Sequence, residues 1–180
     1  MNNNILFYGV PGVGKTYITK ELSNILNLPL IELDTFRGIL QKGKKISDYP
    51  FLFYGTTEAY KSFGDPTEGN IIKGLISVRK AMENTVKQSL DSLKSRSVTE
   101  GAFLDPRYSI NYGTVILLVQ EDEGRHRTQF FKNRKNTEEN NQSFIVSRIL
   151  QKYLIEESVK LGVQQFSSID LEKIKKYIYG

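Results

Sequence analysis

The chain has 180 residues, a formal net charge of +5, one histidine and no cysteine, which excludes disulfides, thiolate metal sites, cysteine nucleophiles and clustered-histidine metal sites. Its acidic and basic residues are interspersed, so the charge by itself does not indicate a nucleic-acid partner. Because it lacks an apolar run of about 18 residues and a signal-peptide pattern, we expect one globular domain, residues 1–180, in the cytoplasm.

Two strand–helix units are expected at the start of the chain. Residues 4–8 (NILFY) form an apolar run typical of a buried parallel strand, and residues 15–26 place apolar side chains on one helical stripe. Residues 29–33 (PLIEL) predict a second strand that ends at Asp34. The aromatic-rich segment 35–70 is expected to form short helices that cover a site, beginning with one over residues 36–41. Its cluster of core or covering aromatic residues is Tyr49, Phe51, Phe53, Tyr54, Tyr60 and Phe63.

The second half of the chain continues the alternation of helices and strands. Residues 114–119 (TVILLV), the most β-branched and aliphatic run, are the best candidate for a central strand. Further helices are predicted over residues 70–94, 142–161 and 170–178, and further strands over 97–99 and 163–166. The apolar face of the helix over residues 142–161 is expected to carry Ile145, Ile149, Leu150, Tyr153 and Leu154. This order predicts an α/β fold with a five-stranded parallel sheet flanked by helices on both faces.

The segment between the first strand and the first helix matches a phosphate-binding motif. Residues 9–16 (GVPGVGKT) satisfy G-x-x-x-x-G-K-[ST], in the strand–loop–helix context that the motif requires. In such a loop, backbone N–H groups point inward, Lys15 reaches the phosphates and the Thr16 hydroxyl binds Mg²⁺. We therefore expect ATP, or another nucleoside triphosphate, with Mg²⁺. The expected nucleotide-binding residues are Gly9, Pro11, Gly12, Val13, Gly14, Lys15 and Thr16.

The rest of the sequence narrows the class of nucleotide-binding protein. GTPases ordinarily carry N-K-x-D and D-x-x-G motifs, and motor ATPases usually end an aliphatic strand with Asp-Glu; neither pattern occurs. Small-molecule kinases of the nucleoside-monophosphate-kinase type place an acidic residue after the second strand and a mobile, arginine-rich lid after the fourth. Asp34 and segment 121–141 match these features, which predicts a P-loop kinase whose transition state is stabilised by positive charge. The candidate catalytic residues are Lys15, Asp34, Arg125, Arg127 and Arg134.

Several candidates also have ordinary structural interpretations. Asp34 could instead cap the helix over residues 36–41, and the lid arginines could be solvated surface residues. Glu100 ends the third strand, where a second carboxylate would hold Mg²⁺ through water, although it could also cap a turn. His126 is expected to be an exposed lid residue rather than a catalytic base.

In addition, the chain resembles the archaeal-type 2-phosphoglycerate kinases. The resemblance is carried by five segments in the same order: GVPGVGKT, LDTFR, YGTTEAY, TEGAFLDP and SFIVSRILQKYLIEESVKLGV. It implies transfer of the ATP γ-phosphate to 2-phosphoglycerate. Where the family's lid tends to read H-x-x-R-F, this chain has Gln129 in place of the arginine, and the tyrosine expected before Phe144 and the family's N-terminal extension are missing. These departures concern the substrate more than the reaction.

The resemblance also implies which residues face the acceptor: Arg37, Thr56, Thr57, Arg79 and Arg148. A guanidinium group can donate two hydrogen bonds to the oxygens of one carboxylate or phosphate group, so a phosphorylated acid would require two or more arginines. Arg79 and Arg148 are flanked by apolar residues and could instead lay their stems over apolar surface. A nucleotide, a nucleoside, a sugar or a nucleic-acid end stays possible as the acceptor, as does a nucleotide-binding regulatory protein. No membrane partner is expected, and the oligomeric state is open.

Overall fold

The computed structural model describes residues 3–179. Its five strands are β1 (Asn4–Tyr8), β2 (Leu30–Glu32), β3 (Val98–Glu100), β4 (Gly113–Val119) and β5 (Gln164–Ser167). They form one sheet in the order β2-β3-β1-β4-β5, and every neighbouring pair is parallel. The predicted five-stranded parallel sheet is therefore confirmed. The middle strand is β1, and β4, which the sequence favoured as central, is the strand beside it.

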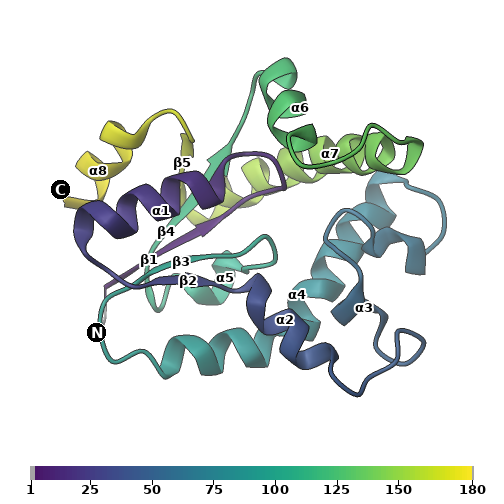
Figure 1. Ribbon diagram of the computed structural model, residues 1–180, viewed down its shortest axis with the longest axis horizontal. Helices are drawn as coiled ribbons and strands as arrows, with labels where there is room; N and C mark the ends of the chain where they lie inside the picture. The colour runs from purple at the N-terminus through teal and green to yellow at the C-terminus, as the bar shows by residue number, and fades with distance from the viewer. Residues whose placement is uncertain (1–2, 180) are drawn as a thin grey trace.

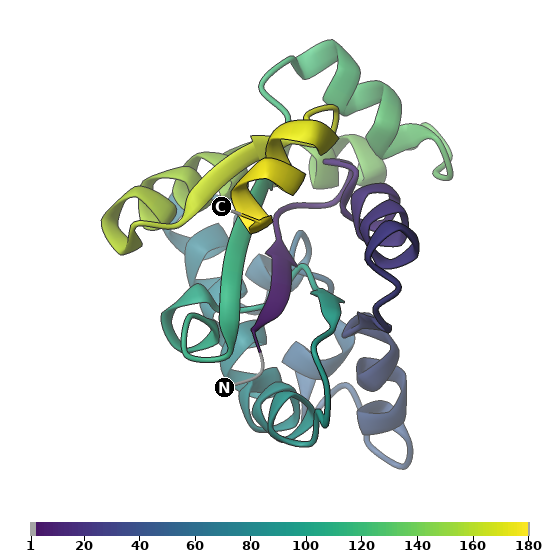
Figure 2. The ribbon, with the colours of Figure 1, turned by 90° about the vertical axis from the view of Figure 1, so that its left-hand side faces the viewer.

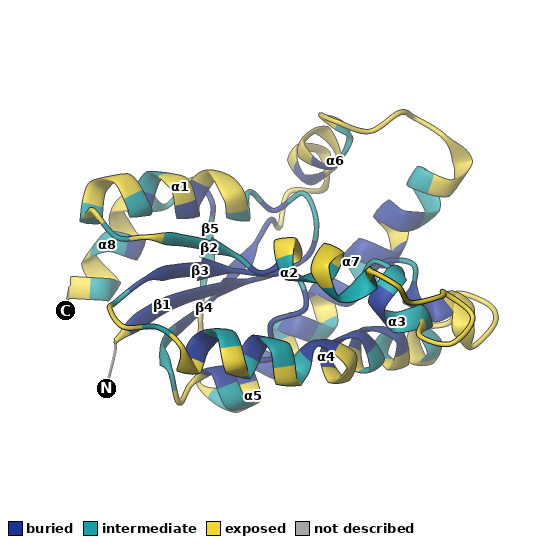
Figure 3. Ribbon diagram, turned by 60° about the horizontal axis from the view of Figure 1, so that its bottom comes forward, coloured by how far each residue is buried: buried dark blue, intermediate teal, exposed yellow. Residues whose placement is uncertain are grey.

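Helices cover both faces of the sheet. Their bounds are α1 (Lys15–Leu26), α2 (Asp34–Gln41), α3 (Pro50–Phe53), the 3-10 helix η1 (Ala59–Ser62), α4 (Glu68–Asp91), α5 (Pro106–Ser109), α6 (Glu123–Phe131), α7 (Glu138–Leu161) and α8 (Leu171–Tyr179). Figure 3 shows the strands between α1 and α8 on one side and α4 and α5 on the other. Because both faces are covered, every residue of β1 is buried, which explains the apolar run at residues 5–8.

The carboxyl ends of three strands meet at one edge of the sheet. Phe7 of β1 and Glu32 of β2 both lie opposite Glu100 of β3. Since the strands are parallel, the loops that follow them leave the sheet together, on the side where α2, α6 and the start of α7 lie (Figure 1; Figure 2). In open α/β sheets this edge is where ligands bind.

Helix α7 differs from its prediction in both its start and its buried face. It begins at Glu138 because the Thr137 side chain caps it by accepting a hydrogen bond from the Asn140 N–H. Ile145, predicted on the apolar face, is 52% exposed. Leu150 and Leu154 are buried as predicted, and Ile149 and Tyr153 are partly buried against the core. The buried face also carries polar residues, which apolar spacing could not indicate: Ser143, Phe144, Val146, Ser147, Leu150, Gln151, Leu154, Glu157 and Ser158.

The aromatic-rich segment is only partly buried. Tyr60 is buried, but Tyr49 and Phe63 are 49% and 40% exposed. Phe63 stacks on Phe51 with ring centroids 5.7 Å apart. These side chains act mainly as a cover over α4, which contacts both α3 and η1.

Gly74 permits the close packing of α4 against η1, and its replacement by alanine should be destabilising. A Cβ there would lie 2.6 Å from the Tyr60 nitrogen and 2.8 Å from the Ala59 carbonyl carbon. Alanine ordinarily stabilises a helix by about 1 kcal/mol relative to glycine. Here the overlap is with backbone, so we expect Gly74→Ala to lower the free energy of unfolding by about 1–3 kcal/mol in urea denaturation.

Gly69 in the same helix supplies the control, because a Cβ there meets nothing within 4 Å. Gly69→Ala should leave the free energy of unfolding unchanged or raise it by up to about 1 kcal/mol. Equal effects of the two substitutions would contradict the packing argument.

Candidate functional site

The loop between β1 and α1 presents backbone N–H groups to a cavity. Gly12 and Gly14 have φ angles of 85° and 90°, which side-chain-bearing residues rarely adopt. Within residues 3–179 the N–H groups of these two glycines have no hydrogen-bond partner. The first turn of α1 adds further free N–H groups and the positive end of the helix dipole. Together these donors form a site for a chain of phosphate groups.

Lys15 lies at the base of this loop. Its Nζ donates to the carbonyl oxygens of Gly9, at 2.9 Å, and Val10, at 3.0 Å. Burial lowers the Lys15 pKa, and the nearby carboxylates of Glu100 and Asp34 oppose that shift. A buried ammonium is stabilised by nearby negative charge, which phosphate oxygens would supply.

Thr16 and Glu100 bring hard oxygen ligands to the same place. Glu100 ends β3 and is buried. Burial raises its pKa, while Lys15 and a hydrogen bond from the Thr16 side chain lower it. A hydroxyl beside a carboxylate fits Mg²⁺, which takes few protein ligands and completes its shell with water and phosphate oxygens. Residues 3–179 contain no cluster of three or more histidine, cysteine or acidic side chains able to hold a metal.

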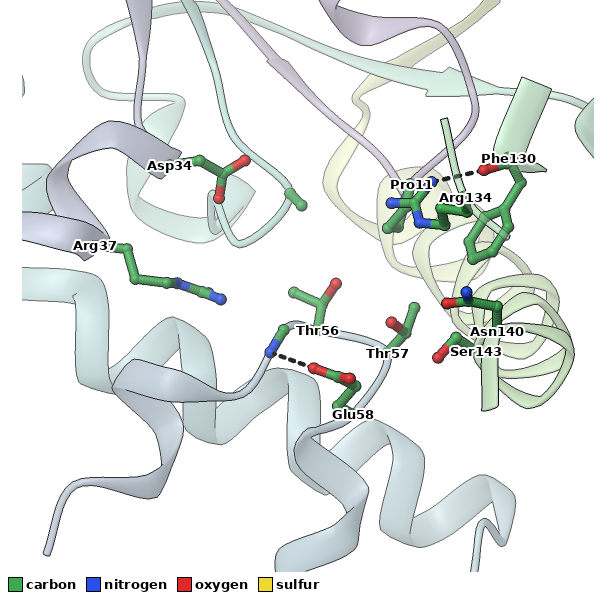
Figure 4. Close-up of a pocket in the computed structure, with 12 residues that line it drawn as sticks. Pro11, Asp34, Arg37, Thr56, Thr57, Glu58, Phe130, Arg134, Asn140 and Ser143 are labelled. Carbon is green, nitrogen blue, oxygen red and sulfur yellow. Dashed lines mark hydrogen bonds between the residues drawn. The ribbon is translucent and has the colours of Figure 1, made fainter. Parts of the chain in front are cut away.

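Two adjoining cavities lie at this edge of the sheet. The first, called here the loop cavity, has a volume of about 550 Å³ and is lined by the phosphate-binding loop, Glu100, Gln129, Lys132 and Ser168. The second, called here the side cavity, has a volume of about 260 Å³ (Figure 4). Four residues line both cavities: Pro11, Asp34, Ala102 and Arg134. Asp34 and Arg134 therefore lie at the boundary between the two.

Asp34 is the first residue of α2, and its alternative role as an N-cap is wrong. The cap position is Leu33, whose N–H donates to the Glu100 carbonyl at 2.9 Å and so continues the pairing of β2 with β3. The chain turns into the helix directly after this bond. The Asp34 side chain is exposed at the cavity boundary, where the positive helix end favours its negative charge.

Arg37 lies one turn further along α2 and reaches into the side cavity (Figure 4). Its Nη1 donates to the Tyr54 carbonyl at 2.9 Å, and its guanidinium lies 4.9 Å from the Phe103 ring centroid. The Nε and Nη2 atoms are buried and have no hydrogen-bond partner among the described residues. Burial lowers the Arg37 pKa, opposed by Asp34 and Glu58. Two unpaired donors on a planar cation match a carboxylate or phosphate group.

Hydroxyl and amide groups complete the side cavity. Thr56 and Thr57, both predicted from the sequence, are buried and line it. Asn140 and Ser143, at the start of α7, line it from the opposite side, as Figure 4 shows. Sequence reasoning missed Asn140 because α7 begins earlier than predicted, and it missed Ser143 because nothing in the sequence shows that the first turns of this helix face the cavity. A capping threonine followed by acidic residues, Thr137-Glu138-Glu139, was the available signal.

Of the three predicted lid arginines, only Arg134 lines the cavities. Its Nη1 donates to the Phe130 carbonyl at 2.7 Å, and its guanidinium lies 4.3 Å from the Phe130 ring centroid. Arg125 is exposed and 3.9 Å from Asp122, the residue that caps α6. Arg127 is exposed, bonds to Asn141 and stacks over two phenylalanine rings. The positively charged side chains that line the loop cavity are therefore Lys15, Lys132 and Arg134.

Two predicted acceptor residues, Arg79 and Arg148, lie outside both cavities. Arg79 is 1% exposed and pairs with Glu157 of α7 through Nη1, at 2.9 Å and 3.0 Å from the two carboxylate oxygens. Arg148 donates to the carbonyls of Gln120, at 2.7 Å, and Glu121, at 3.2 Å, just after β4. The structure therefore gives both arginines protein partners and does not bring them to the acceptor side.

The expectation that His126 is exposed is wrong. Its side chain is fully buried because α6 packs His126 and Phe130 against the phosphate-binding loop. The His126 ring also contacts the Phe144 ring of α7, with centroids 5.2 Å apart. Asp105 and Arg107 form an ordinary turn, in which Asp105 caps α5 by accepting a hydrogen bond from the Arg107 N–H.

Comparison with known proteins agrees with a P-loop nucleotide-binding fold. Residues 5–153 match the model of the family described as "ATPase family associated with various cellular activities (AAA)". None of the curated proteins matches the sequence. Among residues 3–179 no helix has the length and apolarity needed to cross a membrane.

Solved structures show the same fold at low sequence identity. Shikimate kinase from Acinetobacter baumannii in complex with shikimate has a TM-score of 0.59 and 18% identity, with 99% of this chain and 94% of that chain covered. Shikimate kinase from Bacteroides thetaiotaomicron has a TM-score of 0.54 and 15% identity, with coverage of 98% and 94%. Deoxyadenosine kinase from M. mycoides with bound dATP has a TM-score of 0.54 and 14% identity, with coverage of 99% and 100%.

Proposed function

The chain belongs to the ATPase family associated with various cellular activities (AAA), and on that premise we propose that it is an ATP-dependent phosphotransferase acting on a hydroxyl group of a small anionic acceptor. The observation that carries the proposal is the pair of adjoining cavities that share Asp34 and Arg134. One offers free N–H groups and a lysine, as a phosphate chain requires. The other offers a buried guanidinium with two free donors. ATP hydrolysis needs no second ligand site, whereas transfer between two ligands does.

Each residue at the boundary would have a separate role. The loop amides and Lys15 would bind the phosphates, and Thr16 and Glu100 would hold Mg²⁺, which neutralises charge on the phosphate oxygens. Asp34 would orient the acceptor hydroxyl and accept its proton as the acceptor oxygen bonds to the γ-phosphorus. The bond from that phosphorus to the β–γ bridging oxygen breaks, leaving ADP. Arg134 would stabilise the charge on the transferred group.

We propose roles for the other parts of the single domain, residues 1–180, from their positions relative to the boundary between the loop cavity and the side cavity. Residues 35–70 would form the acceptor-side region, since they supply Arg37, Thr56 and Thr57. Residues 121–141 would form a lid that carries Arg134. Closure of such a lid would exclude water, which otherwise competes with the acceptor as the nucleophile. Arg125 and Arg127 would approach the phosphates only through that motion.

The best candidate acceptor is 2-phosphoglycerate or a similar small phosphorylated acid. The sequence resemblance supports this choice, and so does the unpaired guanidinium of Arg37, which a neutral sugar or nucleoside would leave without an anionic partner. The structural neighbours named for shikimate and deoxyadenosine support a small acid or a nucleoside as alternatives. An ATP-consumption screen with phosphorylated acids, other hydroxy acids, nucleosides and sugars would identify the class, with Lys15→Ala as the inactive control.

A nucleotide-binding regulatory protein, or an ATPase without an acceptor, is the second candidate, and the family match favours it. The two candidates differ in what an acceptor does to ADP formation. A phosphotransferase should accelerate when its acceptor is added and should yield phosphorylated acceptor in equal amount. Stoichiometric ATP binding with no acceleration by any compound of the screen would favour the regulatory protein.

Removing the Arg37 guanidinium is expected to weaken acceptor binding selectively. For Arg37→Met we expect the KM of the acceptor to rise roughly 10- to 100-fold, because a charge-assisted bond pair is lost. The KM of ATP should change less than about twofold, since Arg37 lines only the side cavity. Arg37→Lys should recover part of the loss, because lysine keeps the positive charge but cannot donate two parallel hydrogen bonds to one anionic group. Equal increases in both KM values would contradict the assignment.

A further inference from the structure

The only histidine of the chain joins α6 and α7 to the phosphate-binding loop. His126 Nε2 lies 2.8 Å from the Pro11 carbonyl oxygen, and its Nδ1 lies 3.4 Å from Arg148 Nη1. The Ser147 hydroxyl donates to the same Pro11 carbonyl at 3.3 Å. Thus one carbonyl of the loop is held by two helices that lie after β4 in the chain.

These partners determine the tautomer of His126. A carbonyl oxygen only accepts hydrogen bonds, so the proton of the Pro11 contact must lie on Nε2. A guanidinium only donates, so Nδ1 must offer Arg148 its lone pair. The imidazole is therefore neutral and carries its proton on Nε2.

The surroundings keep the imidazole neutral. Burial has the largest effect and lowers the His126 pKa below its ordinary value of 6.5. The positive charges of Arg148 on α7 and Lys15 on α1 lower it further, while the Pro11 carbonyl and Glu123 on α6 oppose them. Because the pKa is depressed on folding, the stabilisation that depends on neutral His126 is complete above pH 6.5 and is lost as the pH falls through the folded-state pKa.

The Pro11 carbonyl controls the direction of a phosphate-binding donor. In a trans peptide the C=O and the following N–H point in opposite directions. With the Pro11 carbonyl turned toward α6 and α7, the Gly12 N–H points away from them. That N–H has no hydrogen-bond partner among the described residues, and Gly12 lines the loop cavity.

Helix α6 packs closely against the backbone of the phosphate-binding loop. A Cβ on Gly12 would lie 2.9 Å from the Phe130 Cα and 3.1 Å from His126 Cδ2. Helix α6 therefore rests directly on the loop backbone.

We propose that His126 is a positioning residue for nucleotide binding: its Nε2–H holds the Pro11 carbonyl and thereby aims the Gly12 N–H at a phosphate oxygen. This inference rests on the proposed nucleotide binding. It assigns His126 no contact with the nucleotide, with the acceptor or with the transferred group. Arg148 has the supporting role of keeping the lone pair on Nδ1.

Two substitutions separate the hydrogen bond from the packing. His126→Phe keeps an aromatic ring beside Phe144 but removes the donor, and we expect the dissociation constant of a non-hydrolysable MgATP analogue to rise about tenfold. His126→Gln keeps an N–H donor near the position of Nε2 and should stay within about threefold of the wild type. The KM of the acceptor should not change in either variant. Melting temperatures without nucleotide would show any general loss of stability.

The outcomes distinguish this inference from the proposed function. Failure of the wild type to bind MgATP more tightly than Lys15→Ala would overturn the proposed function. Tight binding by the wild type and equally tight binding by His126→Phe would overturn only the role of His126. Equal weakening in His126→Phe and His126→Gln would assign the effect to packing and would also overturn it.

Nitrogen NMR of the single imidazole tests the inference on the unaltered protein, should His126→Phe fail to fold. At pH 6.5 the ¹⁵N shifts are expected to show a neutral ring with its proton on Nε2, and the Nε2 signal is expected to move when the MgATP analogue is added. A protonated ring, a proton on Nδ1, or an Nε2 shift that does not change when the MgATP analogue is added would contradict the proposal.

Discussion

Asp34→Asn is expected to lower the turnover number of phosphoryl transfer by about 10²- to 10⁴-fold, the usual contribution of a positioned general base. Asparagine has nearly the same shape, but it cannot take the proton of the acceptor hydroxyl. Because Asp34 lies at the boundary of the two cavities and is exposed, the folded structure should tolerate the change. The dissociation constants of the MgATP analogue and of the acceptor should therefore change less than about threefold.

Asp65→Asn is the matched control for this experiment. Asp65 is an exposed carboxylate before α4 that lines neither cavity, so its replacement should leave the turnover number unchanged. Initial rates at saturating ATP and acceptor measure the effect directly. Full transfer activity in Asp34→Asn would show that another group orients the hydroxyl, and Glu58, the other carboxylate of the side cavity, would then be tested.

Glu157→Leu is expected to lower the free energy of unfolding by about 3–5 kcal/mol, because it leaves the Arg79 charge buried without its carboxylate. Arg79 and Glu157 are 1% and 8% exposed, and their ion pair joins α4 to α7. Tyr153 also donates to Glu157, at 3.3 Å, so the loss would affect a second polar group. Urea denaturation measures the change.

Neighbouring positions supply the controls for the ion pair. Glu156→Leu, at the adjacent exposed carboxylate, should change stability by less than about 0.5 kcal/mol. The double substitution Arg79→Met with Glu157→Leu should be more stable than either single one, because it removes both buried charges. If Arg79→Met weakened acceptor binding without loss of stability, Arg79 would have the acceptor role that the sequence resemblance implies.

The phosphate-binding loop and the parallel sheet were predictable because their signals are local. Residues 9–16 carry the loop chemistry in one contiguous stretch, and they lie between a strand and a helix that hydrophobic pattern alone locates. A parallel strand covered on both faces must be apolar at successive positions, as β1 is. The same pattern places Asp34 shortly after β2, which ends at Glu32. The adjacency of Asp34 and Glu100 follows from strand order, which places β2 beside β3.

Tertiary structure alone decided which of the similar side chains reach the site. Arg37 and Arg79 both lie among apolar residues of a helix. Arg37 lines the side cavity, whereas Arg79 pairs with Glu157, 78 positions away in the chain. His126, in a polar segment, is buried only because α6 lies on the loop that begins at Gly9. A local pattern specifies which backbone forms and which residue types a site needs. The partner of a buried charge is determined by how distant helices pack, because a buried charged side chain is costly unless an oppositely charged or hydrogen-bonding group lies beside it.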